Sequence, residues 1–200
     1  MQPLIHLSIL IIKFKKDRIL KIRSSQEFDR LEIEKIHKTA FGKAKGLVIA
    51  ELVNGLFDDQ TAEPLLSLVA VKNKNIIGHV LFTKVNIAHS PILVSARILA
   101  PLAVLPEDQS TGVGGRLIKE GLGRLKKDGV NLVFVLGHPG YYPRSGFIPA
   151  GKLGFEAPYQ IPKKHAGAWM VINLSSGIIG KAKGTVECSD VLNQPQHWRE

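Results

Sequence analysis

The sequence has only one cysteine, Cys188, in 200 residues. This excludes an intramolecular disulfide and a zinc site built on paired cysteines, and a single free thiol is typical of the reducing cytoplasm. Long apolar runs are also missing. The run from Leu4 to Ile12 contains His6 and Ser8 and has about half of the ~20 residues that a membrane-spanning helix needs. We therefore expect a folded cytoplasmic protein with no metal site and no membrane span.

Acidic residues are scarce beside basic ones. The chain has 27 Lys and Arg against 17 Asp and Glu, which gives a net charge of +10 with histidine neutral. Aromatic residues make up only 6% of the chain. They do not alternate with the basic residues, although such alternation is typical of a surface that binds nucleic acid. A solvated basic face is therefore favoured, and nucleic-acid binding stays open as a weaker alternative. An apolar fraction of 44% predicts a globular chain with a sizeable core.

The chain is expected to form a single domain, because neither a repeated segment nor a low-complexity linker divides it. Ser24 and Glu27 stand at capping-box spacing before the apolar residues Phe28, Leu31 and Ile36, which predicts a helix start. Strand and hairpin patterns surround two helical patterns in this half. We expect, in chain order, a strand over 18–23, helices over 24–41 and 47–56, and a hairpin of strands over 65–71 and 75–87.

A strand–helix–strand unit follows. The run over 96–105 is almost wholly apolar, as in a central strand covered on both faces. Pro101 interrupts it and, because proline cannot donate to the ladder, predicts a bulge or a local separation from one neighbouring strand. An amphipathic helix begins within 109–115, and a strand over 131–136 is expected to run parallel to the first. A ligand crevice is expected at the carboxyl ends of these strands.

The segment 109–116, QSTGVGGR, joins the first of these strands to the helix. Its three glycines predict a tight turn with bare main-chain N–H groups at a helix N-terminus, an arrangement that binds phosphate. A P-loop is excluded because no GxxxxGK[ST] string occurs, and the dinucleotide fingerprint is excluded because its third glycine position holds Leu117. On these residues alone, a tight turn without a ligand remains the alternative.

The spacing Gln109-x-x-Gly112-x-Gly114, followed by YYPRSGF over 141–147, resembles the acyl-CoA loop and the tyrosine segment of the GNAT N-acetyltransferase superfamily, in a bacterial subgroup of predicted acetyltransferases. The resemblance covers about 19–174. It implies an α/β fold: a mixed, mostly antiparallel central sheet with a parallel βαβ unit that carries the acyl-CoA site. Residues 1–18 are left as an N-terminal extension or extra strand. Residues 175–200 have no assigned role, and packing back or self-association as a homodimer stay open for them.

This resemblance implies transfer of an acetyl group from acetyl-CoA, as cosubstrate, to an amine of a small molecule or peptide by direct attack. It places the pyrophosphate at the glycine loop and the pantetheine arm beside the first strand of the unit, where a main-chain N–H near Ala103 or Val104 polarises the thioester carbonyl. An acyl-CoA-binding module without turnover is the alternative. The implied cofactor-binding residues are Leu102, Ala103, Val104, Gln109, Ser110, Thr111, Gly112, Val113, Gly114, Gly115 and Arg116.

The resemblance also implies catalytic residues. Tyr142 matches the family tyrosine that protonates the leaving thiolate, and a phenol is protonated at neutral pH. Tyr141 is expected to pack or to line the coenzyme side. The usual glutamate base is missing, because 96–105 contains no acidic residue. His138, after the second parallel strand, is the candidate base, with a turn residue bonded to backbone as its alternative. The segment 153–167 is expected to set acceptor specificity.

Overall fold

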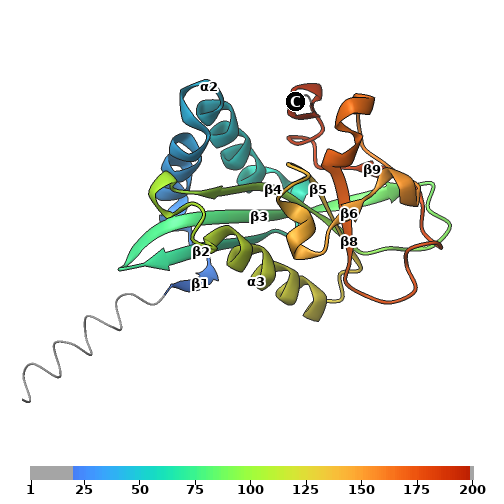
Figure 1. Cartoon of the computed structure of the whole chain (residues 1–200), viewed down its shortest axis with the longest axis horizontal. Coiled ribbons are helices and arrows are strands. Elements are labelled where there is room, and N and C mark those ends of the chain that lie inside the picture. Colours follow the sequence, from blue (N-terminus) through green and yellow to red (C-terminus); the bar gives the residue numbers. More distant parts are fainter. Residues whose placement is uncertain (1–19, 199–200) are drawn as a thin grey trace, which may run out of the picture.

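The structure, a computed structural model, describes residues 20–198 and is built around one mixed β-sheet (Figure 1). The expected extension over 1–18 and the first residues of the expected strand over 18–23 lie outside the described residues. The strands are β1 (Lys21–Ser24), β2 (Leu66–Lys72), β3 (Asn75–Ala88), β4 (Ala96–Val104), β5 (Leu132–Leu136), β6 (Ile148–Pro149), β7 (Phe155–Glu156), β8 (Trp169–Asn173) and β9 (Gly184–Glu187).

The strand order β1-β2-β3-β4-β5-β8-β6 confirms the mixed, mostly antiparallel sheet. Along this path only β4 and β5 pair in parallel, among the strands of residues 20–198. The helix α3 (Val113–Lys127) connects them, so the expected βαβ unit is confirmed. The hairpin of β2 and β3 is confirmed as well, with Lys72 opposite Asn75 at its turn. None of the helices between residues 20 and 198 is long and apolar enough to cross a membrane.

The two helices expected over 24–41 and 47–56 form the bent helix α2 (Arg30–Asp58), which is interrupted at Gly42 (φ 69°, ψ −175°). The expected capping box is wrong. The N–H of Gln26 donates to Asp29 Oδ2 at 2.7 Å, so the helix begins after the 3₁₀ turn η1 (Glu27–Asp29) rather than at Ser24. Two of the apolar residues of that pattern, Phe28 and Leu31, are exposed. The remaining 3₁₀ turns are η2 (Gln60–Ala62), η3 (Pro106–Asp108), η4 (Tyr142–Ser145), η5 (Gly151–Leu153), η6 (Lys163–Ala168) and η7 (Pro195–Trp198).

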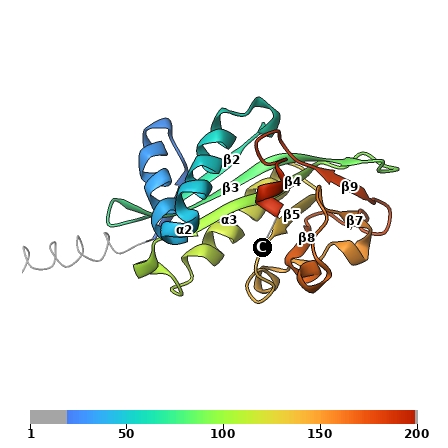
Figure 2. The same ribbon diagram turned by 90° about the horizontal axis from the view of Figure 1, so that it is seen from above.

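The sheet is covered on both faces. Helix α3 packs on one face, and α2 and the C-terminal segment pack on the other (Figures 1 and 2). Strand β9 pairs with the end of β3, with Ile87 opposite Val186. Beyond it, Trp198 is buried, its ring lies 5.7 Å from that of Trp169, and its indole N–H donates to Leu192 O at 3.0 Å. The segment 175–198 thus packs back onto the sheet.

A chain of polar side chains runs through the core under α2. His37 Nε2 lies 2.8 Å from His79 Nδ1, His79 Nε2 lies 2.9 Å from Ser67 Oγ, and Ser25 Oγ donates to Ser67 Oγ at 2.6 Å. Burial lowers the pKa of His37 to about 3, and burial, followed by electrostatic repulsion between the two imidazoles when protonated, lowers the pKa of His79 well below its usual value. Both rings are therefore neutral in the folded protein. Ser25 and Ser67 also line a polar cavity of about 340 Å³ at the far end of this chain of contacts.

Two glycines of α3 give a matched test of its packing against β3. A Cβ added to Gly121 would lie 2.3 Å from Phe82 Cε2, whereas one added to Gly123 meets no atom within 4 Å. Gly121→Ala is expected to lower the free energy of unfolding by about 1–3 kcal/mol, because the core cannot accept the methyl group without shifting. Gly123→Ala is expected to raise it by about 0.5–1 kcal/mol through lower backbone entropy in the unfolded chain. Urea unfolding measures both, and equal stabilities would contradict this packing.

Candidate active site

The two parallel strands pair over only a short stretch. Ala96 to Ile98 of β4 lie opposite Leu132 to Phe134 of β5, and the remainder of β5 pairs only with β8. Past Ile98, the register between β3 and β4 shifts so that Ala100 and Pro101 together oppose a single residue of β3. Pro101 therefore marks both a bulge and the separation from β5, the two outcomes predicted for it. The edge of β4 that faces β5 is free of a strand partner from this point on.

The glycine loop leads directly from this free edge into α3. Gly112 precedes the helix with φ +88°, a conformation that favours glycine, and a Cβ added to Gly115 would meet no atom within 4 Å. Among the described residues, no acceptor is found for the N–H groups of Val113, Gly114 and Gly115, whereas the N–H of Arg116 donates to Gly112 O at 3.1 Å. Free N–H groups at a helix N-terminus form an anion-binding site, and the helix dipole adds to it.

Side chains hold this loop in place from outside. Gln109 Nε2 donates to Val104 O at 2.9 Å, and Thr111 Oγ1 donates to Asp108 O at 2.6 Å. Asp108 is 7% exposed and accepts a bond from Lys72 Nζ at 2.6 Å, so its negative charge is paired beside the anion site. The loop is therefore fixed by its own hydrogen bonds, and its helix-side N–H groups remain available.

A cleft of about 1020 Å³ joins the free edge of β4, the glycine loop and the carboxyl end of β5. It contains nearly all of the predicted site: Leu102, Ala103, Val104, Gln109, Ser110, Gly112, Val113, Gly114, Gly115, His138 and Tyr142 line it. Thr111 and Arg116 are exposed and do not line it.

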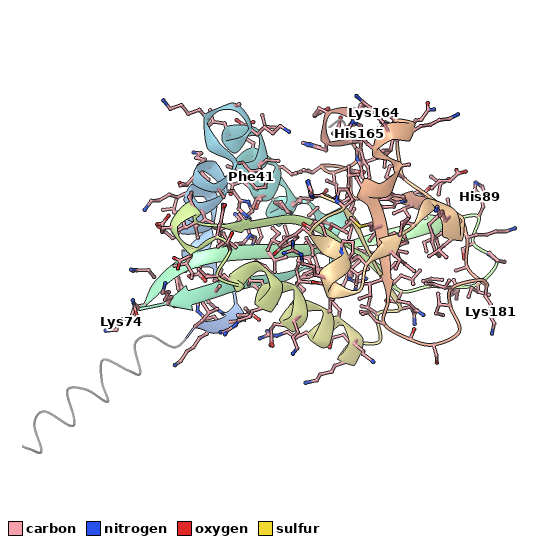
Figure 3. All side chains as sticks on the ribbon, in the orientation of Figure 1. Phe41, Lys74, His89, Lys164, His165 and Lys181 are labelled. Carbon is pink, nitrogen blue, oxygen red and sulfur yellow. The ribbon has the colours of Figure 1, made fainter. Side chains whose placement is uncertain are left out.

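Two segments that the sequence analysis did not assign to the site complete the cleft. The middle of α2 contributes apolar residues that include Phe41 and Leu52, and Figure 3 shows Phe41 on that helix. The C-terminal segment contributes Leu192 and the residues from Gln196 to Trp198. The isolated tryptophan in a polar tail was the one sequence signal for this contribution. None of the described residues 153–167, the expected specificity segment, lines the cleft, and Tyr159 of that segment donates instead to Asn193 O at 3.0 Å.

The two neighbouring tyrosines, at the start of η4, have different surroundings. The Tyr142 ring packs against Gly137, where an added Cβ would lie 2.2 Å from its Cε2, and against Phe147 with ring centroids 5.7 Å apart. Burial raises the pKa of Tyr142 above its usual value, so the hydroxyl is protonated at neutral pH. The Tyr141 hydroxyl packs directly against Gly114, so closely that a Cβ added to this glycine would clash with it. Tyr141 therefore contacts the first turn of α3, whereas Tyr142 lies at the end of β5.

His138 is exposed at the mouth of the cleft, and its Nδ1 accepts a bond from the N–H of Gly140 at 3.0 Å. This is the turn-residue arrangement that the sequence left open beside the role of base. Residues 20–198 contain no group of three or more His, Cys, Asp or Glu placed to hold a metal ion.

Comparison with known proteins agrees with this geometry. A family model described as an acetyltransferase (GNAT) domain matches residues 21–150. YjhQ of Escherichia coli strain K12, described as an uncharacterized N-acetyltransferase, is 43% identical over 166 residues, which are 81% of this chain and 88% of that protein.

Solved structures give the same relationship. YhbS of Escherichia coli in complex with CoA superposes with a TM-score of 0.77 at 27% identity, over 88% of this chain and 92% of that chain. A GNAT acetyltransferase of Brucella melitensis in complex with acetyl-CoA gives 0.69 at 26% identity, over 88% and 99%. From its fold, its glycine loop and these relatives, the chain belongs to the GNAT acetyltransferase family.

Proposed function

We propose that the protein transfers the acetyl group of acetyl-CoA to an amine of a small molecule or a peptide by direct attack. One observation carries this proposal: the free N–H groups at the start of α3, the unpaired edge of β4 and Tyr142 all face the same cleft. The cleft volume of about 1020 Å³ suits a ligand as long as a coenzyme A thioester together with an acceptor.

The glycine loop would hold the diphosphate of the coenzyme. The N–H groups of Val113, Gly114 and Gly115 have no acceptor within the described chain, and a diphosphate supplies several negatively charged acceptors. Gly112 and Gly115 leave the space above these groups empty, because no atom lies within 4 Å of their added Cβ positions. Bare backbone and the helix dipole thus bind the anion with little need for specific side chains.

The alternation of β4 indicates which main-chain groups face the gap. The Leu105 N–H donates to Ile77 O at 2.9 Å, so the main-chain N–H and C=O groups of Leu105 point toward β3. The main-chain N–H and C=O groups of successive residues in a strand point to opposite edges. Those of Ala103 therefore also face β3, whereas those of Leu102 and Val104 face the gap. The pantetheine arm would pair with Leu102 and Val104. We assign polarisation of the thioester carbonyl to Val104 N–H in preference to Ala103.

Acetyl-CoA supplies an activated acyl group whose thiol leaves when the amine attacks. The main-chain N–H of β4 stabilises negative charge on the carbonyl oxygen, a contribution worth roughly 3 kcal/mol where one such donor has been removed. Tyr142, protonated because burial raises its pKa, donates its proton to the leaving sulfur. The ring contacts with Gly137 and Phe147 fix the hydroxyl in position for this step.

Gly115→Asp separates coenzyme binding from folding. A carboxylate in the first turn of α3 interacts favourably with the helix dipole, so the free energy of unfolding is expected to equal or exceed that of the unmodified protein. The same charge repels a diphosphate by about 1–4 kcal/mol, which predicts a loss of acetyl-CoA affinity of about tenfold or more by calorimetry. The uncharged Gly115→Asn is the matched control for the size of the side chain. Its affinity for acetyl-CoA should lie between those of the unmodified protein and Gly115→Asp. Unchanged affinity in Gly115→Asp would place the diphosphate elsewhere.

Tyr142→Phe tests the proton donor while keeping the packing. The expected result is a fall in kcat of about 10²- to 10⁴-fold in thiol release from acetyl-CoA, with little change in the KM for acetyl-CoA. Tyr141→Phe is the control, because its hydroxyl contacts Gly114 rather than the end of β5, and its kcat should stay near that of the unmodified protein. Tight acetyl-CoA binding without turnover on a broad panel of amines would contradict the proposal and favour a binding module.

A further inference from the structure

The cleft raises the question of which group accepts the proton of the attacking amine. Among the described residues that line it, Asp108 is the one carboxylate. Asp108 is 7% exposed, is bonded to Lys72 Nζ at 2.6 Å and lies on the glycine-loop side. Its charge is paired with that of Lys72, and it lies at the end of the cleft proposed for the diphosphate rather than at the acceptor end. The imidazole side chains that line the cleft, among the described residues, are those of His138 and His197.

His138 is poorly placed to accept a proton. Its Nδ1 already accepts a hydrogen bond from the N–H of Gly140, which puts the proton of a neutral ring on Nε2. Protonation of His138 would have to occur at Nδ1 and would cost that bond.

His197 meets the requirements that His138 does not. Its ring is half-buried in the cleft, and no hydrogen bond to either ring nitrogen is found in the described part of the chain. Its backbone is fixed, because its N–H donates to Gln194 O at 3.0 Å and the next residue, Trp198, is buried. The backbone at His197 is therefore held in place, and both ring nitrogens are available to a ligand.

The packing of η7 places His197 near the gap between the strands. The ring of Trp198 contacts that of Trp169, and Trp169 lies directly opposite Leu136, the last residue of β5, in the ladder with β8. Leu136 and the following Gly137, which packs on Tyr142, line the cleft. The C-terminal segment that carries His197 lies on the face of the sheet that holds α2, opposite α3 (Figures 1 and 2). An acceptor would enter on this face.

We propose that His197 is the general base of the reaction, an inference that rests on the proposed acetyl transfer. A neutral ring nitrogen of His197 takes one proton from the amine as the new C–N bond forms. The C–S bond breaks, and Tyr142 gives its proton to the leaving sulfur. Water then takes the proton from His197 and returns one to Tyr142, so that amine and thioester become amide and thiol with no net change in protons.

The electrostatics of the cleft agree with this role. Burial lowers the pKa of His197 below its usual value, so the ring is neutral and able to accept a proton at neutral pH. No unpaired carboxylate among the described lining residues would raise that pKa again. The other charged or titratable side chains facing the cleft are Lys45 of α2, Asp108 of the loop, and His138, Tyr141, Tyr142 and Arg144 near the end of β5.

His197→Asn tests the proposal in the full chain, with His89→Asn, at an exposed histidine outside the cleft, as the matched control and His138→Asn as the test of the competing base. The acceptor used is whichever primary amine the unmodified protein acetylates fastest among amino acids, polyamines, amino sugars and peptides. His197→Asn is expected to lower kcat by about 10²- to 10⁴-fold, leave the KM for acetyl-CoA and the unfolding midpoint unchanged, and remove the acidic limb that His197 gives the pH profile. His89→Asn should change neither rate nor profile, His138→Asn should keep the acidic limb, and added imidazole should partly restore His197→Asn.

The outcomes separate the two proposals. If the unmodified protein acetylates an amine and His197→Asn keeps its rate and pH profile, the role of His197 is wrong while acetyl transfer stands. A large loss in His138→Asn instead would reassign the base to His138. If the unmodified protein acetylates none of these amines, the proposed function fails, and the role of His197 fails with it.

Discussion

The separation of β4 from β5 after Ile98 is the constraint on which the cleft depends. Parallel strands joined by a crossover helix bring the N-terminus of that helix to the carboxyl end of the first strand. In this chain, the bulge at Ala100 and Pro101 lies just after Ile98, the last residue paired with β5, and just before the glycine loop. Had the strands stayed paired, their edges would be closed, and the free N–H groups of α3 would have no extended groove beside them. One local irregularity therefore joins an anion site to a strand edge.

The second constraint is the packing of the C-terminal segment. The buried Trp198 contacts Trp169, and Trp169 pairs with the end of β5. A tryptophan of this kind removes roughly 150–250 Å² from water, which is worth roughly 4–6 kcal/mol at about 25 cal/mol/Å². That burial acts together with the pairing of β9 with β3 and the bond from Tyr159 to Asn193 O to hold a tail that contains little regular structure. The side of the cleft that we propose for the acceptor is formed by residues far in sequence from the glycine loop, and the backbone of His197 is held there because it precedes the buried Trp198.

The sequence predicted the features whose signals are local. Apolar runs gave the hairpin and the two parallel strands within a residue or two of β2, β3, β4 and β5. Pro101 indicated the bulge, and the three glycines indicated the turn before α3. The start of α2 was misplaced because Gln26 and Asp29 form the capping box. Ser24 and Glu27 have the same spacing, but the backbone conformation decides which of the two pairs forms.

The contribution of the C-terminal segment to the cleft could not be located from the sequence, and the reason is different. Residues 175–198 are polar and mostly irregular, and β9 is only four residues long. Their position follows from tertiary contacts with β3, Trp169 and Tyr159, which no periodicity in the segment reports. For the same reason the sequence indicated His138, which stands beside a recognisable strand, and gave no signal for His197.

Backbone amide chemical shifts during a titration with CoA test the central claim most directly, because they report on each N–H group separately. The account predicts that the largest changes fall on Val113, Gly114 and Gly115, followed by Leu102 and Val104 on the free edge of β4. Changes confined to another region, such as the polar cavity lined by Ser25 and Ser67, with the amides of α3 unaffected, would contradict it.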